Sequence, residues 1–359
     1  MSKGQASQKA IAEHLGLAVG TVSRAMNGYP DIAKSTRDRV MAAARELGYR
    51  PNNAARRLST GVSEVAAYIM PEQTSSLSEP FIAELLKGLG ETLRKRGWDL
   101  MVTHTTSAQD ELEQIDRLWN TGAVGAIVIS RPLKKDPRIP LMQKLGCPFV
   151  VHGRSASEAP FAWYDVDGQD AFMSSVNHLV GLGHRRIAFV GSPLQYEFAQ
   201  SRLDGYKQGL KINGLSYDPE LVQIADISDA GGERATHQLL TLEAPPTAIL
   251  AVTDTVALGV LTAIRAAGLR PGPDISVIGY DGLQFGVHTN PPLTSMEQPR
   301  AHAGRRIAEM VFNLIDGADP KDVTELQRAH LVSRATDAPA KHPNKPEINS
   351  VREKQNDTD

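Results

Sequence analysis

Cysteine is almost absent from this sequence, in which Cys147 is the single cysteine among 359 residues. A disulfide framework and a cysteine-based structural zinc site are therefore excluded, and a cytoplasmic location is expected. The sequence also lacks any run of about 18 apolar residues, so we expect no helix that crosses a membrane. Residues 1–10 are polar and lack the apolar segment of a secretory signal.

The motifs of nucleotide-dependent enzymes are missing as well. No Gly-x-Gly-x-x-Gly follows the first apolar run of the body, and no phosphate loop with Gly-Lys-Ser or Gly-Lys-Thr occurs. His184, beside Arg185 and Arg186, belongs to no catalytic set and is expected to be structural. We therefore expect a protein that is not an enzyme and that binds no cofactor and no metal.

The net charge is small, at −2, but it is unevenly distributed. Residues 1–61 contain ten Lys or Arg and four Asp or Glu, which gives this segment a charge of +6. The remaining 298 residues contain 29 basic and 37 acidic residues, a charge of −8. A basic head on an acidic body indicates one anionic partner such as nucleic acid. A solvated basic face without a partner is the alternative.

Three short helices are expected in this head, over residues 8–15, about 19–26 and about 34–47. Ser7 is placed to cap the first helix, and Gly16 separates it from the second. Two helices joined by a tight glycine turn are typical of a helix-turn-helix module, whose second helix enters the major groove of DNA. The periodicity alone also fits any other three-helix bundle.

Beyond the head, the sequence alternates between strand-like and helix-like segments. Strands separated by helices of about 10–18 residues indicate parallel sheets covered on both faces, and about 270 residues suffice for two lobes. A ligand then binds in a cleft at the carboxyl ends of the strands. The expected strands are 65–70, 100–104, 126–129, 149–152, 187–190, 248–252 and 276–279, and the expected helices are 82–96, 108–120, 171–182, 202–212, 232–242 and 255–267.

Distinctive short motifs occur in both the head and the body. They are residues 21–27 (TVSRAMN), 36–40 (TRDRV), 47–52 (LGYRPN), 183–191 (GHRRIAFVG), 202–206 (RLDGY), 277–281 (VIGYD) and 291–294 (PPLT). Together they resemble the LacI/GalR (lactose-repressor) family of bacterial regulators. The resemblance implies an all-α helix-turn-helix head plus an α/β two-lobed effector domain similar to periplasmic sugar-binding proteins. It also implies a homodimer that binds a pseudo-palindromic operator and a small-molecule effector.

The same resemblance divides the chain into four parts. The DNA-binding domain is expected over residues 1–50, a hinge helix over 51–61 and the effector domain over 62–336. The charged, proline-rich residues 337–359 are expected to be a disordered tail. The N-lobe of the effector domain is expected to comprise 62–163 and 292–322, and the C-lobe 164–291 and 323–336.

DNA contacts are implied for the second helix and for the hinge. Arg24 is the strongest candidate for reading a guanine, with a phosphate contact alone as the alternative. Val19 and Gly20 occupy the positions that most vary operator choice, and neither side chain can hydrogen-bond a base edge, so we expect weak direct readout there. Ala18 and Ala33 stand where the family usually has helix caps. The remaining candidates are Thr21, Ser23 and Asn27, together with Asn53, Ala55 and Leu58 in the hinge, where Leu58 would wedge between base pairs.

An effector site is implied in the cleft, where several residues suit a polyol. Arg202 and Asp281 offer hydrogen bonds to hydroxyl groups, with a cross-lobe salt bridge as the alternative. Phe81 would stack on the apolar face of a sugar unless it belongs to the lobe core. Thr253 keeps a hydroxyl where many relatives have asparagine. Arg154 and Asp167 are weaker candidates, and Trp163 fits either a contact or a core position.

These residues predict a transcriptional repressor whose operator affinity depends on a neutral mono- or disaccharide, an α-glucoside being one example. Acidic residues near the expected cleft disfavour a strongly anionic ligand. A purine or phosphosugar effector stays open, as does the choice between inducer and co-repressor. A transport-type sugar-binding protein would share the body, but it would carry a secretory signal and no basic head.

Overall fold

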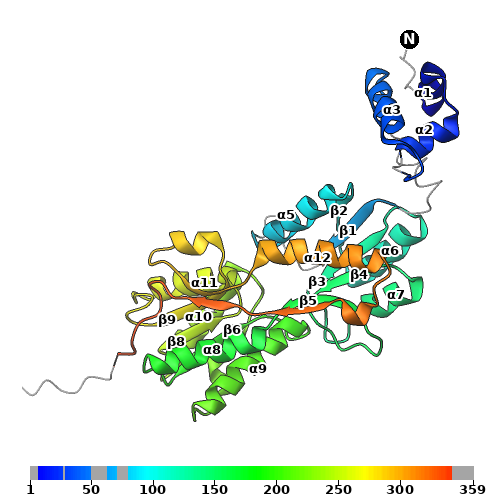
Figure 1. Ribbon diagram of the computed structural model, residues 1–359. Coiled ribbons are helices and arrows are strands. Elements are labelled where there is room, and N and C mark those ends of the chain that lie inside the picture. The colour runs from blue at the N-terminus through cyan, green and yellow to red at the C-terminus, as the bar shows by residue number, and fades with distance from the viewer. Residues whose placement is uncertain (1–6, 27–28, 50–62, 71–79, 342–359) are drawn as a thin grey trace, which may run out of the picture. The chain divides into compact units, whose positions relative to one another are not determined.

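The computed structural model describes residues 7–26, 29–49, 63–70 and 80–341 (Figure 1). The chain divides after Ser63 into two compact units. The first is an all-α head, and the second is an α/β body built on two six-stranded sheets. Within these described residues, we find no helix that is long and apolar enough to cross a bilayer.

The head contains the three expected helices, α1 (Gln8–Leu15), α2 (Val19–Met26) and α3 (Lys34–Glu46). Ser7 caps α1, since its hydroxyl oxygen accepts a hydrogen bond from the Ala10 amide at 3.2 Å. Gly16 ends this helix at a φ of 65°, a left-handed conformation that glycine adopts without steric cost. The small core of the head consists of Ile11, Ala12, Val22, Ala25, Val40, Ala43 and Ala44.

The first lobe of the body, the N-lobe, has a parallel sheet with the strand order β11-β5-β4-β3-β1-β2. Helices α5 (Pro80–Lys95) and α12 (Arg300–Ile315) cover one face, and α6 (Ala108–Asn120) and α7 (Arg138–Leu145) cover the other. Both faces are apolar, as expected for a sheet between two helical layers. Its strands are β1 (Val65–Met70), β2 (Asp99–His104), β3 (Ala126–Ser130), β4 (Phe149–His152), β5 (Ala162–Val166) and β11 (Thr324–Gln327).

The second lobe, the C-lobe, has the strand order β12-β10-β9-β8-β6-β7, in which β12 alone runs antiparallel to its neighbour. Helices α8 (Gly168–Gly181) and α9 (Glu197–Ile212) pack together, as do α10 (Asp229–Leu240) and α11 (Asp254–Ala266). Its strands are β6 (Ile187–Gly191), β7 (Val222–Ile224), β8 (Ala248–Ala251), β9 (Ser276–Asp281), β10 (Thr294–Glu297) and β12 (His330–Val332).

The lobe boundaries expected from the sequence are wrong at each crossing between the lobes. Residues 164–166 belong to β5 of the N-lobe sheet, and β10 pairs with β9 in the C-lobe rather than joining the N-lobe. Strand β11 returns to the N-lobe, where it pairs with β5. The chain therefore crosses near residues 167, 298 and 328. Backbone pairing decides these positions, and strands of three to five residues carry little pattern that could reveal them.

The tail begins later than expected, because residues 337–341 are packed onto the C-lobe. The Asp337 carboxylate accepts a hydrogen bond from Thr294 and lies 2.7 Å from Nε2 of His178. His184 Nε2 donates to the Ala338 carbonyl at 2.9 Å, and its Nδ1 lies 2.9 Å from the Thr247 hydroxyl. His184 is thus structural, as predicted. The remaining tail, residues 342–359, lies outside the described residues.

Candidate functional site

Helix α2, the expected recognition helix, exposes one face to solvent. Val19 is 45% exposed, Gly20 and Arg24 are exposed, and Thr21 and Ser23 are half-buried. Val22 and Ala25 lie on the opposite face, in the core of the head. The helical period thus directs the predicted DNA-contacting side chains outward. Asn27 and the hinge candidates Asn53, Ala55 and Leu58 lie outside the described residues.

Arg24 has partners that the sequence did not reveal. Its guanidinium forms an ion pair with Asp31, and its central carbon lies 5.6 Å from the centre of the Tyr29 ring. Arg24 and Asp31 are both about half exposed, so the pair stays within reach of solvent and of DNA. The ion pair involves one terminal nitrogen of the guanidinium, so other donors of Arg24 stay available for a guanine or a phosphate while Asp31 orients the side chain.

A pocket of about 720 Å³, including the part open to solvent, lies between the two lobes of the body. Residues that follow or end β3, β4 and β5 line it from the N-lobe, and residues that end or follow β8, β9 and β10 line it from the C-lobe. This is the carboxyl edge of both sheets, where ligands bind in open α/β folds. The structure brings together the candidates Phe81, Arg154, Arg202, Thr253 and Asp281 at this pocket.

Two weaker candidates lie outside the pocket lining. Asp167 caps α8, because its carboxylate accepts a hydrogen bond from the Asp170 amide at 3.0 Å. Trp163 packs against the apolar core between the N-lobe sheet and helices α6 and α7. The central guanidinium carbon of Arg154 lies 5.9 Å from the centre of the Trp163 ring. Asp165, one of the acidic residues expected near the cleft, also lines the pocket. The sequence did not indicate several further lining residues, most of which follow or end strands: Arg131, Pro132, His152, Glu197, Phe198, Ser201, Tyr280 and Gln298.

Arg202 is buried at the base of the pocket and keeps an unused donor. Its Nη1 donates to the Val252 carbonyl at 2.6 Å, and its guanidinium lies 3.8 Å from the centre of the Tyr280 ring. Its Nε is buried without a hydrogen-bond partner among the described residues. An unpaired buried donor is costly, so a ligand acceptor at this position would relieve it.

Asp281, at the end of β9, also lines this pocket. Its backbone has an unusual φ of 119°, and its Oδ1 accepts a hydrogen bond from Nε2 of Gln298 at 2.6 Å. Arg300 donates to its carbonyl oxygen. These contacts fix the carboxylate at the pocket edge in a backbone conformation that persists only where the surroundings determine it.

The N-lobe wall of the pocket is aromatic. The ring of Phe81 stacks on that of His152, with centroids 5.6 Å apart and an interplanar angle of 12°. Burial, assisted by the charges of Arg131 and Arg202, lowers the pKa of His152 to about 4. His152 is therefore neutral near physiological pH and acts as part of an apolar surface. The described residues contain no cluster of side chains suited to a metal ion.

Two family models match this chain. The model described as bacterial regulatory proteins of the lacI family matches residues 9–52, which include the three helices of the head. The model described as a periplasmic binding protein-like domain matches residues 176–336, which comprise most of the C-lobe together with α12 and β11 of the N-lobe. The first match lies within the head unit, and the second lies within the body unit.

Curated relatives match over nearly the whole length. The HTH-type transcriptional regulator AglR of Rhizobium meliloti is 38% identical over 340 residues, 92% of this chain and 94% of AglR. The HTH-type transcriptional regulator RafR of Escherichia coli is 33% identical over 319 residues, 88% of this chain and 94% of RafR. Both are regulators rather than enzymes.

Solved structures share the architecture. The complex of the transcriptional regulator CelR with cellobiose superposes with a TM-score of 0.72 at 29% identity, over 92% of this chain and 100% of that one. The lac repressor dimer bound to operator and to the anti-inducer ONPF gives a TM-score of 0.81 at 28% identity, over 93% and 99% of the two chains. With a helix-turn-helix head, a two-lobed body and full-length relatives of this kind, the chain belongs to the LacI family of bacterial transcriptional regulators.

Proposed function

We propose that this regulator is a repressor controlled by a neutral saccharide that binds between the two lobes. The observation that carries the proposal is the composition of the pocket. Three guanidinium groups and three carboxylates line it beside an aromatic wall: Arg131, Arg154, Arg202, Asp165, Glu197 and Asp281. Balanced charges supply donors and acceptors for hydroxyl groups without a net field that would demand an ionic ligand.

Specific contacts support a sugar in this position. Phe81, backed by His152, offers a flat apolar surface for a pyranose ring, while Arg202 offers its unpaired Nε. The Arg154 guanidinium is already held by Asp165 at 2.8 Å, which keeps it oriented rather than free to bind a phosphate. The relative CelR has been solved in complex with the disaccharide cellobiose.

Saccharide binding would control the head through linkage. We propose that a homodimer places its two α2 helices on the halves of a pseudo-palindromic operator, and that closure of the cleft changes the population of the operator-binding state. If the saccharide changes operator affinity, then operator must change saccharide affinity by the same factor. The direction of that change distinguishes an inducer from a co-repressor.

The test is a calorimetric titration of the full chain with neutral saccharides, including cellobiose and α-glucosides, and with a phosphosugar and a purine base. We expect a neutral saccharide to bind and Arg202→Ala to weaken it by a factor of about ten or more, the loss of one or two buried hydrogen bonds. Arg186→Ala is the matched control, because Arg186 pairs with Asp218 outside the pocket lining. Undiminished affinity in Arg202→Ala, or binding of the anionic ligand alone, would contradict the proposal.

A further inference from the structure

The loop after β3, residues 131–137, pairs with the other lobe through its backbone. The Lys134 amide donates to the Gln195 carbonyl at 3.2 Å, and the Glu197 amide donates to the Pro132 carbonyl at 3.1 Å. These bonds form a single antiparallel bridge centred on Leu133 and Tyr196. The segment 193–197, which leads from β6 into α9, thus binds directly to the N-lobe.

The same two segments line the pocket from both sides. The loop contributes Arg131 and Pro132, and the C-lobe segment leads to Glu197 and Phe198. A ligand in the pocket would therefore contact residues on both sides of the bridge. Opening of the cleft along this side would break the bridge, so ligand binding and bridge formation must be coupled.

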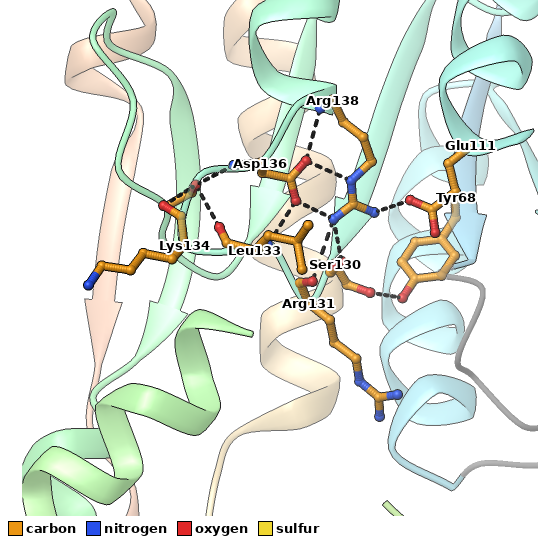
Figure 2. Close-up of polar contacts among 9 residues, drawn as sticks. Tyr68, Glu111, Ser130, Arg131, Leu133, Lys134, Asp136 and Arg138 are labelled. Carbon is orange, nitrogen blue, oxygen red and sulfur yellow. Dashed lines mark hydrogen bonds and ion pairs between the residues drawn. The ribbon is translucent and has the colours of Figure 1, made fainter. Parts of the chain in front are cut away.

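A buried ionic cluster holds the loop in the shape that makes this bridge (Figure 2). The Arg138 side chain, 5% exposed, pairs with Asp136 at 2.6 Å and with Glu111 on α6 at 2.9 Å. The Asp136 carboxylate also accepts hydrogen bonds from the Leu133 and Arg138 amides, each at 2.9 Å. Arg131 extends away from the cluster, as Figure 2 shows. Asp136 therefore connects the buried guanidinium to the central residue of the bridge.

The remaining contacts extend this cluster to two strands. Arg138 Nη2 donates to the Ser130 carbonyl at the end of β3 at 3.2 Å, and the Ser130 hydroxyl lies 2.6 Å from that of Tyr68 on β1. Ser155, after β4, donates to the Leu133 carbonyl at 2.8 Å. Buried ion pairs contribute little stability compared with apolar packing, but they impose one geometry on the groups that they join. Here the ion pairs of Arg138 impose the conformation of the loop formed by residues 131–137.

We propose that residues 131–137 and 193–197 form an interlobe latch, and that Arg138 is its positioning residue. Through Asp136, Arg138 holds Leu133 and Lys134 where they pair with the C-lobe, and this sets how readily the cleft closes on its ligand. The inference rests on the proposed function only in taking the pocket as the ligand site. The latch itself is tested without ligand.

A pair of engineered cysteines measures the latch directly. Leu133 and Tyr196 face each other as a non-hydrogen-bonded antiparallel pair, whose α-carbons are typically about 4.5 Å apart and within disulfide range. Burial raises the pKa of the Cys147 thiol to about 12, so the native cysteine stays unreactive. The equilibrium of Leu133→Cys/Tyr196→Cys with glutathione then reports how often the two segments meet.

We expect Arg138→Met in this background to lower the disulfide equilibrium constant by a factor of about ten, within the usual range of coupling between sites. Arg138→Lys, which keeps the charge, should restore part of it. Trp119→Phe is the control, because it removes a hydrogen bond to the Leu145 carbonyl at the other end of α7, away from the loop. If Arg138→Met does not fold, Asp136→Asn tests the same connection. If the folded variant, Arg138→Met or Asp136→Asn, has the same disulfide equilibrium constant as the Trp119→Phe control, the proposal is overturned.

Ligand exchange supplies the second measurement. In the oxidised cysteine pair, the saccharide selected by calorimetry should dissociate about ten times more slowly than in the reduced pair, because the latch cannot open. An unchanged dissociation rate would show that the bridge does not restrict the cleft and would reject the latch. If no saccharide binds even the unmodified chain, the proposed function fails, whereas the thiol equilibrium still decides the latch.

Discussion

Asp254, in the first turn of α11, is a fully buried carboxyl group beside the pocket residue Asp281. It accepts hydrogen bonds from the Leu283 amide and the Ser295 hydroxyl, each at 2.6 Å. Burial, followed by the negative charge of Asp281, raises its pKa to about 7. Because this pKa exceeds that of the unfolded chain, folding takes up a proton between about pH 4 and about pH 7.

We therefore predict that Asp254 makes stability fall as pH rises through that window, with the loss complete above about pH 7. Asp254→Asn should reduce this dependence, since the amide can accept from Leu283 and donate to Ser295 without ionising. Urea unfolding at several pH values measures the effect. Asp316→Asn, at an exposed pair with Arg96, is the control and should keep the wild-type profile. Parallel profiles for wild type and Asp254→Asn would contradict the assignment.

Gly20 gives a second prediction at the scale of a residue. A β-carbon here would meet no atom within 4 Å, so Gly20→Ala should stabilise α2 by about 0.5–1 kcal/mol without strain. Neither glycine nor alanine has a side chain that can hydrogen-bond a base edge. The substitution should therefore change the discrimination between base pairs facing position 20 by less than about 2 kcal/mol. Binding to operators selected in vitro and varied at those positions measures this. Arg24→Ala should instead cost about 1–3 kcal/mol if Arg24 reads a base.

At the scale of elements, the helices of the head differ in their caps. Ser7 caps α1 through its side chain, whereas Ala33, at the start of α3, makes no side-chain cap. Ala33→Ser should therefore stabilise the head by about 1 kcal/mol, and Ser7→Ala should destabilise it by a similar amount. Thermal unfolding of the head in the full chain checks both. Equal stability of the wild type and Ala33→Ser would show that the exposed start of α3 needs no cap.

Helices α5 and α12 pack so closely that glycine is required at their contact. A β-carbon at Gly88 would overlap the Ala301 carbonyl oxygen, whereas one at Gly90 on the same helix would lie 3.6 Å from Leu100. Gly88→Ala should lower N-lobe stability by about 1–3 kcal/mol through overpacking, and Gly90→Ala should be neutral or stabilising. Urea unfolding of the matched pair measures the difference. Similar free energies of unfolding for Gly88→Ala and Gly90→Ala would indicate that α12 can move away from α5.

At the scale of the whole molecule, the uneven charge predicts how operator binding responds to salt. Residues 1–61 carry +6 and the rest of the chain −8, so phosphate contacts should come from the head. The slope of log affinity against log salt should be about −0.9 for each phosphate contact, and therefore steep. Titration of the selected operator across a range of salt concentrations measures it. A slope near zero would contradict a DNA interface formed by this head.

Local sequence was enough for much of this description. The periodicity of short segments and the Ser7 and Gly16 boundary residues identified the three helices of the head, because capping and helical spacing are local properties. Long apolar strands and amphipathic helices likewise identified the alternating body. Motifs in the sequence also pointed to Arg202 and Asp281, which lie with Phe81 at one pocket.

Only the tertiary structure revealed the contacts between residues that are far apart in the sequence. The crossings between lobes depend on which strand pairs with β5 and β9, and the short β10 and β11 give no pattern that reveals this. Glu111 meets Arg138, and Leu133 meets Tyr196, only when separate elements are packed together. Composition and periodicity describe a residue's own element, whereas pairing across a fold depends on the positions of all the others.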